Sequence, residues 1–306
     1  MKRILSLSLL CLLAACDPDP KPTDPKAPAS APLAQAQALI EKQDYAGATA
    51  VLEAARGPSG EDPAIVKRLV DLYKAQNDPA RAIQRARAGL DAHPDAKELY
   101  LPLANLYFSV KQIDTAQALL VEAVKRGVDD SGVELSLGAC LAAKEDVPGA
   151  RAAFERAEAK GADAKTVAMN LALLLVQENK PAEALAAFEA AHAKYPDMAG
   201  PKREIGRLLL AEVSAAGQAG KPLDKPKVDR AMDLLWGVKD ELKNDWRMHE
   251  AMGDGWLLLG DYDASLLAYT DALKLGQNPK SVEDRYRVAK KLSIEAKAAA
   301  EQSEPK

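Results

Sequence analysis

The feature that most constrains this chain is a spacing of 34 residues that recurs along it. Five alanines keep this spacing, and so do five large aliphatic residues, one in the first half of each period. The alanines are Ala48, Ala82, Ala116, Ala150 and Ala184, and the aliphatic residues are Leu69, Leu103, Leu137, Leu171 and Ile205. Such a period predicts a repeat protein, in which each unit buries its apolar face by stacking on its neighbours.

The residue classes within one period indicate what each unit is. A small residue follows the aliphatic one, as at Gly138 and Gly206, and a large residue recurs in the second half, as at Phe154 and Phe188. This pattern resembles the tetratricopeptide-repeat (TPR) family over about residues 31 to 300. The resemblance implies an all-α fold, a right-handed superhelical solenoid of about seven antiparallel helix pairs.

The 34-residue period is interrupted at one place, and a different segment follows the last repeat. Between Ala184 and Ala231 one unit is 13 residues longer than the others, and the excess lies in residues 213–227. That segment is rich in Gly, Pro, Ala and Lys, so we expect an insertion loop there, with or without a lengthened helix before it. Residues 281–300 carry Val282 and Ala289 on one face and Arg and Lys opposite, which predicts a capping helix. The solenoid is expected over residues 34–300, with a disordered tail over 301–306.

The N-terminus has the three parts of a secretory signal. Lys2 and Arg3 precede an apolar run over residues 4–13, and a Leu-Ala-Ala sequence ends at Cys16. The closing tetrapeptide resembles the lipobox of bacterial lipoproteins. The resemblance implies removal of residues 1–15 and attachment of acyl chains such as palmitate to Cys16. The protein would then be lipid-anchored to a bacterial membrane and face the periplasm, with inner and outer membrane both open. The alternative is an ordinary cleaved signal with a chance cysteine.

Residues 16–33 do not resemble the repeats. Residues 17–33 contain six prolines with alternating Asp and Lys, a composition that favours extended polyproline II and cannot build a core. Seventeen such residues reach on the order of 50 Å. We interpret this segment as a tether between the lipidated Cys16 and the repeats. A proline-rich docking motif is the alternative.

No pattern of catalytic residues is present. The three histidines, His93, His192 and His249, lack metal-ligand spacing, and neither a nucleophile elbow nor a phosphate-binding glycine loop occurs. With a net charge of −4 and no basic stripe, nucleic acid is not an expected partner. Cys140, the one cysteine in the repeats, lies among apolar residues and is expected to be a small buried hydrophobe. We therefore predict no enzyme activity, no cofactor and no metal site.

The resemblance also implies where partners bind. In TPR proteins the first helix of each pair lines a concave groove. The residues of this chain at groove-facing offsets are Leu101, Asn105, Phe108, Leu135, Met169, Leu173, Val176, Arg203 and Arg207. Asn105 stands where some TPR domains clamp a peptide carboxylate, but Leu101 replaces the accompanying lysine, so we expect no clamp. The predicted groove has an apolar middle and charged ends, which suits binding of an amphipathic helix or of a peptide with both apolar and charged residues. The alternative is that tight curvature buries these side chains.

These observations predict a membrane-anchored scaffold or adaptor that mediates protein–protein interactions in the bacterial cell envelope. Its partners would be envelope proteins or peptides held in the groove, with the membrane bound through Cys16. The alternative is a periplasmic binder of hydrophobic small molecules or lipids, which would use the same apolar groove.

Overall fold

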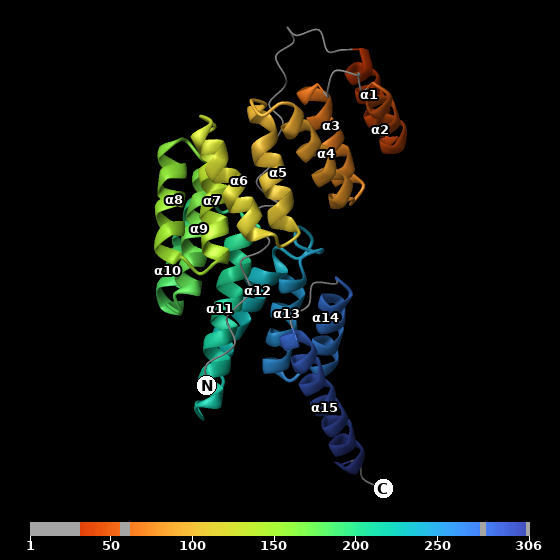
Figure 1. The fold of residues 1–306 in the computed structure, drawn as a ribbon. Helices are drawn as coiled ribbons and strands as arrows, with labels where there is room; N and C mark the ends of the chain where they lie inside the picture. Colours follow the sequence, from red (N-terminus) through yellow and green to blue (C-terminus); the bar gives the residue numbers. More distant parts are fainter. Residues whose placement is uncertain (1–30, 56–61, 276–279, 304–306) are drawn as a thin grey trace. The chain divides into compact units, whose positions relative to one another are not determined.

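The computed structural model describes residues 31–55, 62–275 and 280–303, which form fifteen α-helices and no strand (Figure 1). The all-α prediction is confirmed. The chain divides into two compact units at the boundary between Glu178 and Asn179. No helix within the described ranges is both long and apolar enough to span a membrane. The signal sequence, Cys16 and nearly all of the tether lie outside the described residues.

Each unit is a stack of helix pairs. In unit 1 (described residues up to Glu178), α1 packs on α2, α3 on α4, α5 on α6 and α7 on α8, and α9 follows. In unit 2 (from Asn179), α11 packs on α12, α13 on α14, and α15 on α14. The helices of unit 1 are α1 (Ala31–Glu41), α2 (Tyr45–Ala54), α3 (Pro63–Ala75), α4 (Pro79–Ala92), α5 (Lys97–Ser109), α6 (Ile113–Lys125), α7 (Ser131–Ala143), α8 (Val147–Ala159) and α9 (Ala164–Gln177). Those of unit 2 are α10 (Pro181–Lys194), α11 (Ala199–Gln218), α12 (Lys225–Trp236), α13 (Trp246–Leu259), α14 (Tyr262–Lys274) and α15 (Lys280–Ser303).

One turn design joins the helices within the pairs. A residue shortly before each second helix adopts left-handed backbone angles, with φ between 56° and 67° at Gln43, Asn77, Lys111, Glu145 and Asn179. These residues are again 34 apart. In the α7–α8 turn the next residue, Asp146, donates its N–H to Leu141 O at 3.0 Å, and its side chain accepts from Gly149 N at 3.0 Å. Such a cap contributes about 1 kcal/mol, which offsets much of the 1–2 kcal/mol cost of the left-handed residue.

The small residue of each first helix makes room for a large one of the second. A Cβ atom on Gly138 of α7 would lie 2.5 Å from Phe154 Cε1 of α8, far inside van der Waals contact. The same position in α13 is Gly253, where a Cβ atom would lie 2.5 Å from Tyr269 Cε1. The large–small pattern seen in the sequence is therefore a close helix contact, repeated in both units.

The insertion is divided between a longer helix and a short connection. α11 has 20 residues and continues to Gln218, so only residues 219–224 separate it from α12. Residues 213–218 are helical rather than loop because alanine favours helix there and Val213, 3% exposed, packs in the core.

The stack ends at α15 as expected of a cap. Its Val282 and Ala289 are fully buried against α14. The α15 position equivalent to Gly253 of α13, which packs against the second helix, holds Arg287, and this residue is exposed. The exposed side of α15 therefore carries charge beside the exposed Val288 and Ile294, and it receives no further helix of this chain within the described residues.

Candidate functional site

The nine predicted groove residues lie on first helices in both units. α5 carries Leu101, Asn105 and Phe108, α7 carries Leu135, α9 carries Met169, Leu173 and Val176, and α11 carries Arg203 and Arg207. First helices also contact one another directly: α5 touches α3 and α7, and α11 touches α13. We call the surface formed by these helices the first-helix face of each unit.

Burial divides the apolar members of this set. Phe108 and Met169 are each 2% exposed and Leu173 is 5% exposed, so these three side chains are not open to a partner. Phe108 joins the core cluster of unit 1, because α5 lies close to the neighbouring first helices. These three residues are buried, as the alternative interpretation of the groove positions predicted. The predicted positions therefore do not form one continuous exposed apolar strip. The half-buried members of the set are Leu101, Asn105, Leu135, Val176 and Arg207.

The half-buried residues of unit 1 make contacts between successive first helices. Leu101 of α5 leans on Gly132 of α7, where a Cβ atom would lie 2.8 Å from Leu101 Cδ2. Asn105 Oδ1 accepts a hydrogen bond from Ser136 Oγ of α7 at 3.0 Å. We call this contact, between residues 31 apart on neighbouring first helices, a rung. A second rung joins Arg68 to Gln37.

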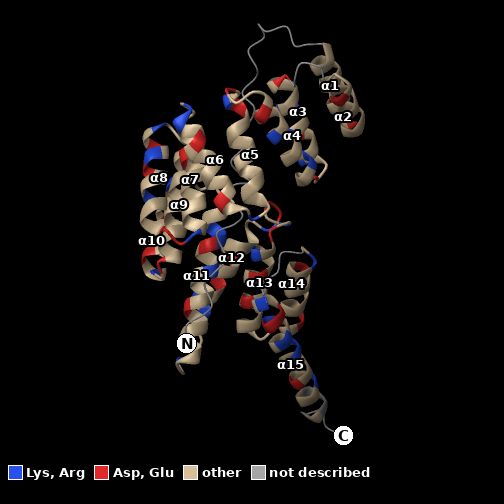
Figure 2. Cartoon of the chain, in the orientation of Figure 1, with Lys and Arg blue, Asp and Glu red and all other residues tan. Residues whose placement is uncertain are grey.

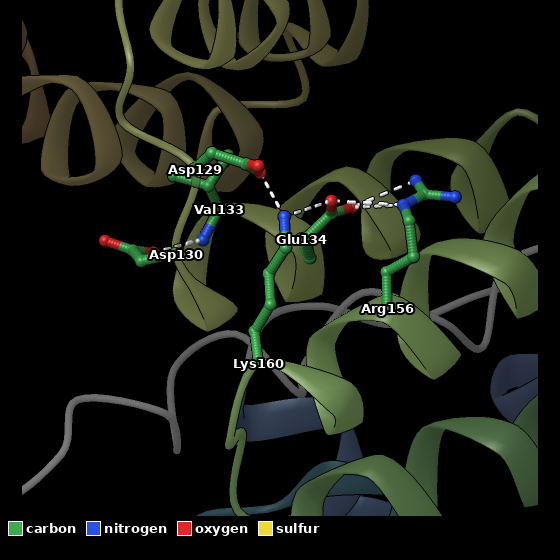
Figure 3. A network of polar contacts seen from close by, with 6 residues as sticks. All are labelled: Asp129, Asp130, Val133, Glu134, Arg156 and Lys160. Atoms are coloured by element: carbon green, nitrogen blue, oxygen red, sulfur yellow. Dashed lines mark hydrogen bonds and ion pairs between the residues drawn. The ribbon is translucent and has the colours of Figure 1, made fainter.

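Unit 1 also contains a buried acid, seen close up in Figure 3. Glu134 of α7 has a side chain only 6% exposed, and it accepts two hydrogen bonds from Arg156 Nε and one from Lys160 Nζ. Burial alone would raise the pKa of Glu134, but the hydrogen bonds from Arg156 and Lys160 lower it overall. The two cations come from α8 and the residue that ends it, so the network ties the pair together. Sequence reasoning missed it, since the residue one period earlier is Tyr100.

In unit 2 the first-helix face is charged. Arg203 of α11 is 9% exposed and binds Glu204 Oε1 through Nη2 at 2.7 Å and Asp245 through Nη1. Arg207 Nε donates to the other Glu204 oxygen at 2.8 Å. Burial alone would raise the pKa of Glu204, but the guanidinium groups of Arg207 and Arg203 lower it to about 2. Arg203 is therefore held within the fold, whereas the Arg207 side chain stays 24% exposed.

A second charged group lies on α13 and α15. Arg285 Nη1 contacts both Glu250, at 3.2 Å, and Asp254, and Tyr269 OH donates to Asp254 Oδ1 at 2.7 Å. Burial raises the pKa of Glu250 and of Asp254 more than Arg285 lowers it. The Arg285–Asp254 contact spans 31 residues and is a third rung.

The charges of unit 2 occupy the same repeat positions with opposite signs. Glu250 and Asp254 stand 47 residues after Arg203 and Arg207, which is one period plus the insertion. Figure 2 shows acidic and basic residues interspersed along α11, α13 and α15. Glu204, Asp245 and Arg285 were not singled out by sequence reasoning. The signal that could have found Glu204 and Arg285 is the spacing of 3 residues from Glu204 to Arg207 and of 31 from Asp254 to Arg285.

No group of three His, Cys, Asp or Glu side chains in the described part of the chain is arranged to hold a metal ion. Cys140 is buried, and burial raises the pKa of its thiol to about 12, so it stays protonated and unreactive at neutral pH. The predicted small buried hydrophobe at Cys140 is confirmed.

Comparison with known proteins agrees with the geometry. Residues 74–135 match the family model for the tetratricopeptide repeat. No curated protein matches the chain in sequence. The fold is similar to that of a tetratricopeptide repeat protein from Parabacteroides merdae, with 15% identity, a TM-score of 0.67, and coverage of 84% of this chain and 97% of that one. It is also similar to the APC/C hetero-tetramer Cut9–Hcn1, with 15% identity, a TM-score of 0.62, and coverage of 87% of this chain and 50% of that one.

Proposed function

We propose that this chain is a tetratricopeptide-repeat scaffold that binds other proteins through its first-helix faces, since residues 74–135 match the repeat family and the fold is similar to that of a tetratricopeptide repeat protein. The observation that carries the proposal is the set of half-buried side chains left on these faces. Leu101, Leu135 and Arg207 are held in place by neighbours on rigid helices, yet each keeps surface that a partner could cover. Fixed apolar and guanidinium groups of this kind lose little entropy on binding. The similar Cut9–Hcn1 structure is itself a hetero-tetramer, which supports an assembly role.

The proposal extends to location. We propose that the scaffold is lipid-anchored at Cys16 to a bacterial membrane and works in the cell envelope. Support comes from the signal-like residues 1–15, the cysteine at their end and the proline-rich segment that follows. Attachment of more than one acyl chain would make the anchor stable, whereas a single chain binds membranes only marginally.

Binding of a hydrophobic small molecule has less support. That function needs an apolar cavity or groove, but Phe108, Met169 and Leu173 are covered by protein. The half-buried Leu101, Leu135 and Val176 remain, and Leu101 and Leu135 already pack against core residues of unit 1. Covering two such side chains with a partner's own side chains contributes roughly 1.5–3 kcal/mol each at most. That is a useful part of the ~8 kcal/mol of a micromolar protein complex.

Photo-crosslinking in cells tests the scaffold. A photoreactive amino acid at Leu101 or Leu135 should give a discrete crosslinked band, because both positions lie on the first-helix face. The matched control is Val121 of the second helix α6, which is 40% exposed and should give no such band. The double change Leu101→Glu with Leu135→Glu should abolish binding of the crosslinked partner while the helical content stays unchanged. Bands from Val121 alone would contradict the proposal.

A separate experiment tests the anchor. Cys16→Ser should abolish incorporation of a palmitate analogue and release the protein from washed membranes. The matched control is Cys11, whose replacement by serine should leave both labelling and membrane attachment as they are. Retention of the Cys16→Ser protein on membranes would refute lipid anchoring and leave the scaffold proposal standing.

A further inference from the structure

The rungs between first helices leave one position open in unit 2. Gln37–Arg68, Asn105–Ser136 and Asp254–Arg285 each join residues 31 apart. For Arg207 the equivalent residue, after allowing for the 13-residue insertion, is Ala251 of α13. A methyl group offers no hydrogen bond, and Arg207 bonds to Glu204 on its own helix instead. The rung between α11 and α13 is thus missing, although the two helices are in contact.

Two charged groups beside this open rung have unused hydrogen-bonding capacity. Arg207 employs only Nε, and its two Nη groups have no hydrogen-bond or ion-pair partner in the described residues. Glu250, next to Ala251, contacts Arg285 Nη1 at 3.2 Å and receives no other polar contact from the described side chains or backbone. The two side chains are 24% and 13% exposed, so a partner can reach both. Arg207 is close enough to Glu250 to lower its pKa, against the larger raising effect of burial.

We propose that this open rung binds a carboxamide, the side chain of an Asn or Gln residue of the protein partner. The carboxamide oxygen accepts from the Nη groups of Arg207, and the carboxamide N–H donates to the Glu250 carboxylate. The inference rests on the proposed function, because it names the chemical group that a partner on the first-helix face of unit 2 presents.

Charge balance favours an amide over an ion. The group contains four acids, Glu204, Asp245, Glu250 and Asp254, and four arginines, Arg203, Arg207, Arg247 and Arg285. An added carboxylate would be attracted by Arg207 but repelled by the negative charge of Glu250. An added ammonium would be attracted by Glu250 but repelled by Arg207. Removing an ion from water is costly unless its new site supplies a counter-charge. A carboxamide supplies a donor and an acceptor and adds no charge.

Selection of peptides on the full chain tests the inference. A phage-displayed library of random peptides is panned against the purified protein, and an Asn or Gln of each binding peptide is replaced by the matching Asp or Glu and by Leu. We expect either replacement to weaken binding about tenfold or more, the size of a lost hydrogen bond to a charged group. Arg207→Lys keeps the charge beside Glu204 but loses the second nitrogen of the fork, and Glu250→Gln keeps the shape. Both variants should bind these peptides about tenfold less tightly, and the Asn→Leu replacement should then cause a smaller further loss than it does with the unchanged protein.

The controls separate this inference from the scaffold proposal. Arg230→Lys on α12 changes an arginine whose ion pair is with Glu189, and it should not alter binding. Thermal unfolding identifies any variant that has lost its fold, and Glu250→Gln decides the case if Arg207→Lys unfolds. Peptides that bind the first-helix face but ignore Arg207 and Glu250, or that prefer Asp to Asn, would overturn the carboxamide site and leave the scaffold intact. Failure to enrich any peptide would count against both.

Discussion

The first-helix faces of the two units share one backbone design and differ in chemistry. Leu101, Leu135 and Met169 stand at the same repeat position as Arg203 and, after the insertion, Glu250. In α5, α7 and α9 of unit 1 this position is filled by apolar side chains, of which Leu101 and Leu135 pack against core residues, whereas α3 carries the exposed Lys67 there. In unit 2 it carries charge, and each charge is satisfied by an opposite one nearby. A repeat backbone therefore tolerates either solution, provided that the buried ions are paired.

The largest expected effect compares the buried acids of the two units. Glu204→Gln should lower the free energy of unfolding by about 3 kcal/mol or more, because Arg203 would keep its charge in a buried site with only Asp245 beside it. Glu134→Gln should cost about 1.5 kcal/mol, since Arg156, 52% exposed, can turn to water. Urea unfolding measures both. Equal losses of stability would contradict the expectation that the cost of removing an acid depends on how deeply its arginine partner is buried.

The next effect should be the same in both units. Gly138→Leu and Gly253→Leu each place atoms inside an aromatic ring of the second helix and should cost roughly 1–3 kcal/mol. Thermal unfolding followed by circular dichroism measures the change. Gly217→Ala is the matched control, because a Cβ atom there meets nothing within 4 Å, and it should stabilise α11 by up to about 1 kcal/mol. Unchanged melting of the Gly138→Leu protein would mean that Gly138 does not occupy the small-residue position of its repeat.

A smaller effect tests the turns, which the comparison predicts to be alike. Asp146→Ala in unit 1 and Asp261→Ala in unit 2 each remove an N-cap hydrogen bond and should cost about 1 kcal/mol. The reverse change is available at Gln112, which caps α6 without a side-chain hydrogen bond. Gln112→Asp should therefore stabilise unit 1 by up to about 1 kcal/mol. The midpoints of denaturant unfolding measure these changes in stability. A large difference between the two Asp→Ala variants would contradict the prediction that the turns of the two units are alike.

The smallest effect is a difference in pH dependence. The lowered pKa of Glu134 means that its contribution to stability is present above its unfolded pKa and is lost as pH falls through the folded value. The raised pKa of Glu250 acts in the opposite sense. Its protonated form favours the folded state, so that contribution is present at low pH and is lost as pH rises through the raised folded value. Urea unfolding over a pH series should show Glu134→Gln and Glu250→Gln deviating from the unchanged protein in opposite directions.

Much of the fold could be predicted from the sequence because its determinants are local or periodic. The 34-residue spacing located the helix pairs, and the small–large pattern that includes Gly138 and Phe154 located the close contact between the helices of a pair. The break in the period located the insertion in the α11–α12 pair. Its division between helix and connection was less clear, because segments rich in Ala, Gly and Lys suit either state until Val213 is seen to be buried.

For the candidate site the sequence by itself determined which residues lie on the first-helix faces, since helical periodicity assigns a side chain to a face. Only the tertiary structure decided which of them stay accessible. Phe108, Met169 and Leu173 are buried while Leu101 and Leu135 remain half-open. Likewise Arg203 is enclosed by Glu204 and Asp245, whereas Arg207 on the same helix stays within reach of a partner. The physical reason is that the distance between neighbouring first helices, and the pairing of charges across it, depend on the side chains of several repeats at once, which no single period records.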